Sequence, residues 1–200
     1  DHLAQWNLRH MKANPPQFIL CKDGVIDNRY PTTDDNLFIR EVLENYLPVL
    51  TEKDYLLLEK SEQPRPFADR QVVLNSEIIS GQLVNISEFS DQVLWLKVNY
   101  RSSLAHKFAA LLYKPETLVL QVTTMDGVEA SHRLIGENLT NGFLLSPKLD
   151  TIVDIQNFLS SDLPLTWIKE FSIHSVPGYS LFSTQEFELE LIQLERDSTP

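Results

Sequence analysis

Apolar residues between positions 35 and 47 recur every three or four residues, which places them on one face of a predicted helix: Ile39, Val42, Leu43 and Tyr46. Asp34 and Asp35 stand at its start, where a side-chain oxygen caps a helix and negative charge is favourable. Pro48 ends the helix, because a proline cannot donate the backbone hydrogen bond that a further turn needs.

The segments around this helix predict a small α/β module. Apolar side chains at helical spacing in residues 1–13, followed by two prolines, predict a helix. Residues 18–22 predict a short buried strand, and residues 49–50 and 55–59 predict a hairpin. We therefore expect a helix at residues 1–13 and an α/β module at residues 14–60.

The pattern changes to strands in the second part of the chain. Residues 61–69 contain two prolines and no apolar periodicity, which predicts a linker. The segments that follow are short, bounded by turns and in part alternating: residues 71–74, 83–86, 93–100, 117–124, 128–135, 143–145, 167–175 and 182–194. This number of short strands predicts an antiparallel β-sandwich-like domain at residues 70–200. The expected fold class is α+β.

Two local signals refine this second domain. Asp126-Gly127 predicts a tight hairpin turn, since both positions of that turn favour residues that tolerate positive φ. Residues 151–159 predict one short amphipathic helix, with Asp150 or Thr151 as its cap.

Composition and charge limit the possible partners. Of the 200 residues, 42% are hydrophobic and 22% charged, the balance of a protein with a packed core. The net charge of −11 and the absence of any run of five basic residues argue against nucleic acid as a partner. No segment reaches the ~20 apolar residues of a membrane-spanning helix. Because the chain starts at Asp1 without a methionine, we expect it to be a processed or excised piece of a longer protein.

No motif in the sequence predicts an active site or a cofactor. The five histidines are scattered, which predicts no metal site, and the six glycines form no phosphate-binding loop. The carboxylate pairs Asp34/Asp35 and Asp150/Asp154 have a sufficient explanation at helix amino termini. Cys21 lies among apolar neighbours and is expected to be a buried thiol. We therefore expect no catalytic residue, no metal and no cofactor.

The candidate binding residues are basic or aromatic. Residues 100–107 form the densest cationic segment of an acidic chain, with Arg101 and Lys107, and Arg133 joins them if the hairpins pair as expected. Such a cluster can hold a phosphate or an anionic sugar, although a solvated strand connection is the more common explanation of such a segment. Trp95 can stack on a sugar if it projects from a sheet, whereas a tryptophan in a sandwich core is the more common use.

Asn85-Ile86-Ser87 and Asn138-Leu139-Thr140 match the acceptor pattern for N-glycosylation. The pattern is short and arises often by chance. It bears on function only in an exported eukaryotic protein.

The first sixty residues contain four runs in a distinctive order: Asn14-Pro15-Pro16-Gln17-Phe18-Ile19-Leu20, Ile26-Asp27-Asn28-Arg29-Tyr30-Pro31, Tyr46-Leu47-Pro48-Val49 and Tyr55-Leu56-Leu57-Leu58-Glu59-Lys60. This order resembles the soluble C-terminal region of bacterial multi-pass membrane proteins of the dolichyl-phosphate-mannose-type glycosyltransferase kind. Arg133-Leu134 and the run Gly142-Phe143-Leu144-Leu145-Ser146-Pro147 resemble a β domain appended to some members.

The resemblance implies a non-catalytic accessory domain on the extracytoplasmic (periplasmic) face of a bacterial membrane. It also implies that the helix at residues 1–13 is a membrane-proximal stem helix. Its expected partners are a glycan, a lipid-linked sugar or another protein of cell-envelope glycan assembly, and the rest of the parent protein holds it at the membrane. The catalytic acid of such transferases lies near the first membrane helices, outside this chain, so no catalytic residue is carried over. The alternatives are a stand-alone carbohydrate-binding module, a glycoside hydrolase-like enzyme and a purely structural domain.

Overall fold

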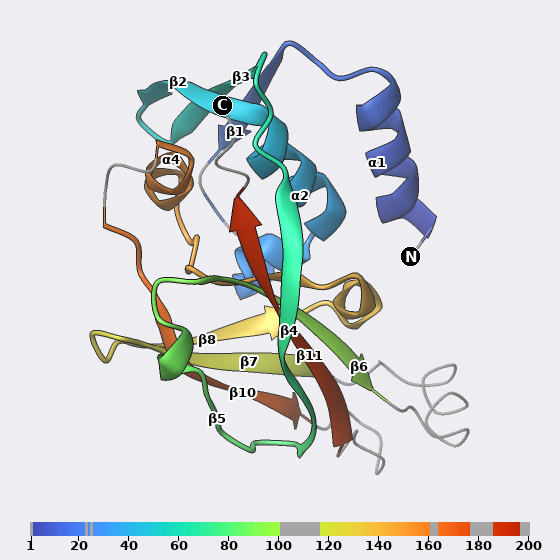
Figure 1. The fold of residues 1–200 in the computed structure, drawn as a ribbon, viewed down its shortest axis with the longest axis vertical. Helices are drawn as coiled ribbons and strands as arrows, with labels where there is room; N and C mark the ends of the chain where they lie inside the picture. The colour runs from blue at the N-terminus through green and yellow to red at the C-terminus, as the bar shows by residue number, and fades with distance from the viewer. Residues whose placement is uncertain are drawn as a thin grey trace.

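The computed structural model describes residues 2–22, 24, 26–100, 117–160, 164–176 and 186–196 (Figure 1). Its helices and strands, in chain order, are α1 (His2–Ala13), β1 (Phe18–Lys22), α2 (Asn36–Asn45), β2 (Tyr46–Glu52), β3 (Tyr55–Lys60), β4 (Phe67–Ile79), β5 (Val84–Asn85), β6 (Val93–Tyr100), β7 (Thr117–Thr124), β8 (Glu129–Leu134), β9 (Phe143–Ser146), α4 (Ile152–Ser160), β10 (Ile168–Val176) and β11 (Glu186–Arg196). Short 3-10 turns occur at Ile26–Asn28, Pro31–Thr33, Ser87–Phe89 and Gly136–Asn141. Within these ranges, no helix combines the length and the apolar character needed to cross a membrane.

The strands form three sheets, ordered β1-β3-β2, β5-β10-β7-β8 and β4-β11-β6-β9. The pairs between these strands are antiparallel. In Figure 1 the first sheet and the helices α1 and α2 occupy one end of the molecule, and the two larger sheets occupy the other. The expected α+β fold with an antiparallel β-sandwich-like domain is confirmed.

The two four-stranded sheets enclose the larger hydrophobic core. The alternation predicted for residues 93–100 holds, since Leu94, Leu96 and Val98 all belong to this core and are fully buried. The same period of two places alternate side chains of β7, β10 and β11 in the core: Leu118, Leu120 and Val122; Phe171 and Ile173; Phe187, Leu189 and Leu191. The other side chains of β7 and β10 therefore lie on the outer face of their sheet.

A second core joins the small module to the sandwich. Its buried members come from both parts of the chain: Met11, Val42, Leu43, Tyr46, Leu56 and Leu58 from the first part, and Phe67, Trp95, Leu144, Leu149, Ile152, Phe158, Leu159, Ile192 and Leu194 from the second. Helix α4 contacts β2 and β3, and the Thr51 hydroxyl donates a 2.7 Å hydrogen bond to the Gln156 side chain. The two parts therefore bury apolar surface against each other.

The segment between β1 and α2 closes one edge of the sandwich. The Tyr30 backbone N–H donates to the Arg133 carbonyl of β8 at 3.0 Å, and the Tyr30 hydroxyl donates to the Leu145 carbonyl at 2.7 Å. Two asparagines fix the same contact with four hydrogen bonds of 2.6–2.8 Å. The Asn36 amide donates to the backbone carbonyls of Asn138 and Gly142. The Asn138 amide donates to the backbone carbonyls of Thr33 and Asp34. An edge strand covered in this way no longer offers free backbone groups to other chains.

Three predicted boundaries differ for tertiary reasons. The helix is Asn36–Asn45, shorter than expected, because Tyr46 already begins β2. Pro48 lies inside β2 beside a bulge, which an edge strand tolerates because one side of it needs no hydrogen-bond donor. Strand β4 begins at Phe67 and has 13 residues, so it takes up the end of the expected linker at residues 61–69.

The predicted turn and caps are partly wrong. The hairpin predicted at Asp126-Gly127 is confirmed, since β7 and β8 pair antiparallel on either side of it. Only Gly127 has a positive φ, of 85°, so the connection is not a tight two-residue turn. Asp35 occupies the cap position of α2 without a capping hydrogen bond from its side chain. At α4 the expected cap is present: the Thr151 hydroxyl accepts from the Asp154 N–H, and the Asp154 carboxylate accepts from the Thr151 N–H.

Candidate functional site

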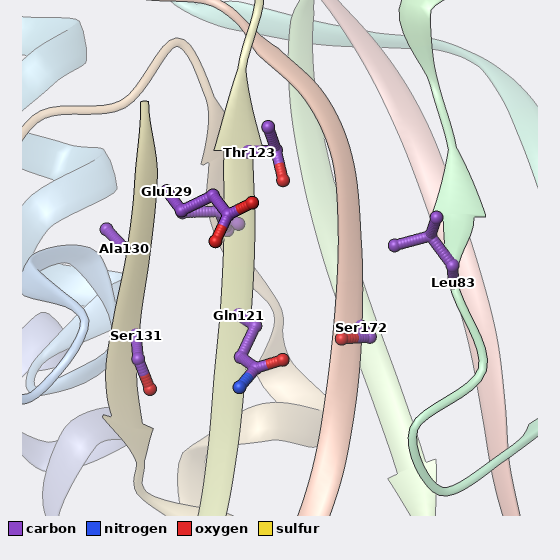
Figure 2. A pocket seen from close by; sticks show the side chains of 8 residues that line it. Leu83, Gln121, Thr123, Glu129, Ala130, Ser131 and Ser172 are labelled. Atoms are coloured by element: carbon purple, nitrogen blue, oxygen red, sulfur yellow. The ribbon is translucent and has the colours of Figure 1, made fainter. Parts of the chain in front are cut away.

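A row of polar side chains crosses the outer face of the β5-β10-β7-β8 sheet. Ser131 on β8 pairs with Gln121 on β7, and Gln121 pairs in turn with Ser172 on β10. Because neighbouring strands lie about 4.8 Å apart, a hydroxyl, an amide and a second hydroxyl stand in line across the sheet. Figure 2 shows Gln121 between the two serines.

This row lies in a groove of about 320 Å³. Leu83, 58% exposed and just before β5, stands at one side of the groove, and Glu129 on β8 stands at the other (Figure 2). The lining consists of Leu83, Gln121, Val122, Thr123, Glu129, Ala130, Ser131 and Ser172. The groove is therefore open to solvent and mostly polar.

Carboxylates give one end of the groove a negative charge. Thr123, next along β7 on the same face, pairs with Glu129 on one side and with Glu170 on the other. No lysine or arginine is among the residues that line the groove. Such a surface accepts hydrogen bonds from hydroxyl groups and repels anions.

A serine–histidine pair borders the same row on β10. The Ser172 hydroxyl and His174 Nε2 are 2.9 Å apart. The turn after β4 fixes the ring from the other side: Gly81 donates its N–H to the Ile173 carbonyl at 2.9 Å, and a Cβ on Gly81 would lie 3.3 Å from His174 Cε1. Among the hydrogen bonds of the described chain, none joins the other ring nitrogen of His174 to a carboxylate, so the orienting third member of a catalytic triad is not found there.

Of the four predicted binding residues, the structure describes two, Arg133 and Trp95, and they lie in different surroundings. Arg133 is half exposed on β8, with Nη1 4.0 Å from the Asp27 carboxylate, and lies next to Ser131 on the outer face. Trp95 is 2% exposed and donates its indole N–H to the Asn141 carbonyl at 3.1 Å. Its ring therefore offers no open face for stacking on a sugar. Arg101 and Lys107 lie outside the described residues.

The other candidate groups have local roles. Asp34 accepts a hydrogen bond from Arg29, and Asp35 accepts one from Asn7, so these carboxylates are held near α2. Among the described residues, no three histidine, cysteine, aspartate or glutamate side chains converge in a possible metal site. Burial raises the pKa of the Cys21 thiol, which keeps it in its less reactive protonated form.

The two glycosylation sequons differ in accessibility. Asn138 is 6% exposed and donates both amide hydrogens to backbone carbonyls, so the folded protein has no free acceptor nitrogen there. Asn85 is exposed, and its Oδ1 accepts hydrogen bonds from the backbone and hydroxyl of Ser87.

Comparisons with known proteins add no further information about the site. No protein-family model matches the chain, and no curated protein or solved structure matches it either. The candidate site therefore rests on the geometry alone.

Sequence reasoning missed the groove because its residues carry no motif. Gln121, Ser131 and Ser172 lie 10 to 51 positions apart along the chain and meet only through the strand register. The available signal was the alternation within residues 117–124, which assigns Gln121 and Thr123 to the outer face. That alternation does not reveal which residues of other strands stand beside them.

Proposed function

We propose that this chain is a non-catalytic binding domain that holds an uncharged, hydroxyl-rich ligand, a glycan, in the groove of the β5-β10-β7-β8 sheet. The observation that carries the proposal is the row Ser131–Gln121–Ser172, which presents donors and acceptors in line on the floor of the groove. Sugar hydroxyls both donate and accept, and they match such a row better than an apolar or a charged ligand does.

The charge of the groove selects the class of glycan. Glu129 and Glu170 flank Thr123 at one end, and carboxylates accept hydrogen bonds strongly from hydroxyl groups. An anionic sugar or a sugar phosphate would meet these carboxylates without a cation among the lining residues. The groove therefore favours a neutral glycan over a lipid-phosphate head group.

The biological setting follows from the resemblance of the sequence. We place the domain on the extracytoplasmic side of a bacterial membrane, as an accessory part of a protein of cell-envelope glycan assembly. In this setting the groove contacts the glycan chain, and the phosphate of a lipid-linked sugar stays near the membrane. The test of the setting is the coding sequence upstream of Asp1: a series of spans of about 20 apolar residues supports it, and a secretory signal alone contradicts it.

Binding is tested by titrating neutral and anionic envelope oligosaccharides while following their ligand resonances by NMR. We expect neutral oligosaccharides to bind more tightly. The Gln121→Ala variant loses a neutral hydrogen bond of about 0.5–1.5 kcal/mol, so we expect binding to weaken by roughly two- to tenfold. Gln71→Ala, the same change on an exposed position of β4 in the other sheet, is the matched control and leaves binding unchanged. Absence of binding at millimolar ligand, or equal effects of the two variants, contradicts the proposal.

The same samples test the hydrolase alternative. One carboxylate, Glu129, lines the groove, and Glu170 stands beside it across Thr123. Ser172 in the lining pairs with His174. Carboxylate pairs and Ser–His pairs are groups that hydrolases use. Prolonged incubation with the bound oligosaccharide, followed by mass spectrometry of the products, detects slow cleavage. If cleavage is seen and Glu129→Gln or Ser172→Ala abolishes it, the chain is an enzyme and not a non-catalytic binding domain.

A further inference from the structure

The outer face of the β1-β3-β2 sheet is apolar and exposed. Its inner face packs into the second core through Leu56 and Leu58, which are fully buried. On the opposite side, Leu20 is 65% exposed, Leu50 55% and Tyr55 41%. An antiparallel sheet with one buried face normally presents polar side chains on the other face. A contiguous apolar patch in that position marks an interaction surface.

The strand register arranges this face in two rows. Leu20, Leu57 and Leu50 form the first row across β1, β3 and β2. They contribute to the lining of a hollow of about 360 Å³. This apolar row is nearly symmetric about the central strand, because a leucine stands at each end of it.

The second row carries opposite charges at its two ends. Lys22 on β1, Tyr55 on β3 and Glu52 on β2 are paired in register. The Lys22 ammonium lies 5.9 Å from the centre of the Tyr55 ring, which places both on the outer face. A lysine therefore stands on one edge of the sheet and a glutamate on the other, at the same height.

We propose that this face is the interface of a homodimer, in which two copies pack sheet against sheet about a two-fold axis parallel to the strands. Such an axis sets β1 of one copy opposite β2 of the other. Leu20 then meets Leu50 of the second copy, and Lys22 meets Glu52 of the second copy, twice in each dimer. Aligned sheet packing at about 10 Å, with strand directions within about 30°, has the geometry that this contact needs.

The alternative two-fold axis, perpendicular to the strands, does not give this match. It sets each strand opposite itself, so Lys22 meets Phe18 of the second copy and the charges find no partner. A self-complementary patch is the requirement for a closed dimer, and the parallel axis meets it. Because the charged row is complementary to itself about this axis, we infer that the partner on this face is a second copy of the chain.

The size of the face limits the affinity. A standard interface buries about 800 Å² on each partner, and a three-stranded sheet face offers a few hundred. Glu59 weakens the association, because it lies on the central strand beyond Leu57 and the axis sets this strand opposite itself. Glu59 therefore faces Glu59 of the second copy, and the two like charges repel each other. The side chain of Gln17 donates to Glu59 at 3.2 Å and takes up part of its charge. We expect a dissociation constant on the order of 100 µM.

Sedimentation velocity from about 10 µM to about 1 mM protein, a range that brackets such a constant, measures the association. We expect the weight-average mass to rise from the monomer toward the dimer. Leu20→Glu removes the association without affecting folding, since Leu20 is exposed. Val72→Glu, at a 52% exposed position of β4, is the matched control and leaves the association unchanged. Circular dichroism verifies that each variant is folded.

A charge exchange separates this dimer from other modes of association. Lys22→Glu alone and Glu52→Lys alone each set like charges against one another and weaken the dimer by roughly threefold to tenfold. The double variant restores opposite pairs across the axis, so its association returns to that of the unchanged protein. A monomer at all concentrations, or a double variant weaker than both single variants, overturns the proposal. Neither outcome bears on the groove, which lies on a different sheet.

Discussion

His132 is the buried ionisable group whose protonation we expect to change the stability of this protein most directly. It lies on β8 with 7% of its surface exposed, and neither ring nitrogen has a hydrogen-bonding partner. The Tyr30 ring meets it edge-on, with the ring centres 5.2 Å apart. The ion pair of Lys148 and Asp150 lies nearby, and the backbone of Arg29 faces the ring without completing a hydrogen bond. A charge at this position would therefore be poorly solvated.

These surroundings lower the pKa of His132. Burial is the main cause; the Asp150 carboxylate raises the pKa in part, and the Lys148 ammonium lowers it further. In the unfolded chain a histidine titrates near 6.5. Above that pH both states are neutral and the full stability is present. As the pH falls below about 6.5, the unfolded state binds a proton that the native state resists, so stability decreases toward the native pKa. Each unit between the two pKa values contributes about 1.4 kcal/mol.

Replacing the ring isolates this contribution. His132→Phe keeps a flat ring against Tyr30 and removes two nitrogens without partners. An unsatisfied buried polar group costs about 1–3 kcal/mol, so we expect the variant to be at least as stable as the unchanged protein near pH 8. Between pH 8 and pH 5 it should lose less stability. Urea unfolding at several pH values measures both effects, and His10→Phe, an exposed position on α1, is the matched control. An equal pH dependence in His132→Phe and the unchanged protein would refute the reasoning.

Three further predictions concern the second core and the contact between the two parts of the chain. Asn36→Ala leaves the backbone carbonyls of Asn138 and Gly142 without their hydrogen-bond donor. We therefore expect the free energy of unfolding, measured with urea, to fall by about 2–4 kcal/mol. An equal loss in the control Asn75→Ala, at an exposed position of β4, would contradict this prediction. Gly142→Ala places a Cβ 2.1 Å from Trp95 Nε1, at a backbone φ of 79° that an alanine rarely adopts. We therefore expect the free energy of unfolding to fall by at least about 2 kcal/mol and the tryptophan fluorescence spectrum to change. A stable variant with an unchanged spectrum would contradict this packing. Because both parts share a core, thermal unfolding should follow one transition by tryptophan fluorescence and by circular dichroism, and two separate transitions would show independent domains.

The sequence correctly predicted the strands in which apolar side chains on one face alternate with side chains of another kind on the other face. Strands β6 and β7 match the predicted ranges because Leu94, Leu96 and Val98, and their counterparts on β7, alternate with side chains of another kind. Strand β4 was predicted at residues 71–74 alone. It is an edge strand with mostly exposed side chains, and its 13 residues are extended because they pair with β11 along their whole length. A pairing partner more than a hundred residues away leaves no local pattern.

Trp95 illustrates why the candidate site was harder to predict than the fold. The alternation correctly set Trp95 on the face of β6 opposite Leu94 and Leu96. An isolated sandwich would expose that face. Here the small module covers it, and the Arg40 guanidinium lies 5.4 Å from the centre of the indole ring. The covering layer comes from a separate part of the sequence, so periodicity within one strand cannot reveal it.

The proposed dimer would strengthen glycan binding by the proposed groove. The groove lies on the β5-β10-β7-β8 sheet and the dimer face on the β1-β3-β2 sheet, and the two share no residue. A shared core joins the part of the chain that carries the dimer face to the sandwich that carries the groove. A dimer would therefore present two grooves in a fixed arrangement. Binding of one groove to a repeating glycan raises the effective concentration of the next repeat at the other groove. Two weak sites on a weak dimer would then bind a polymer tightly while each releases a short oligosaccharide rapidly.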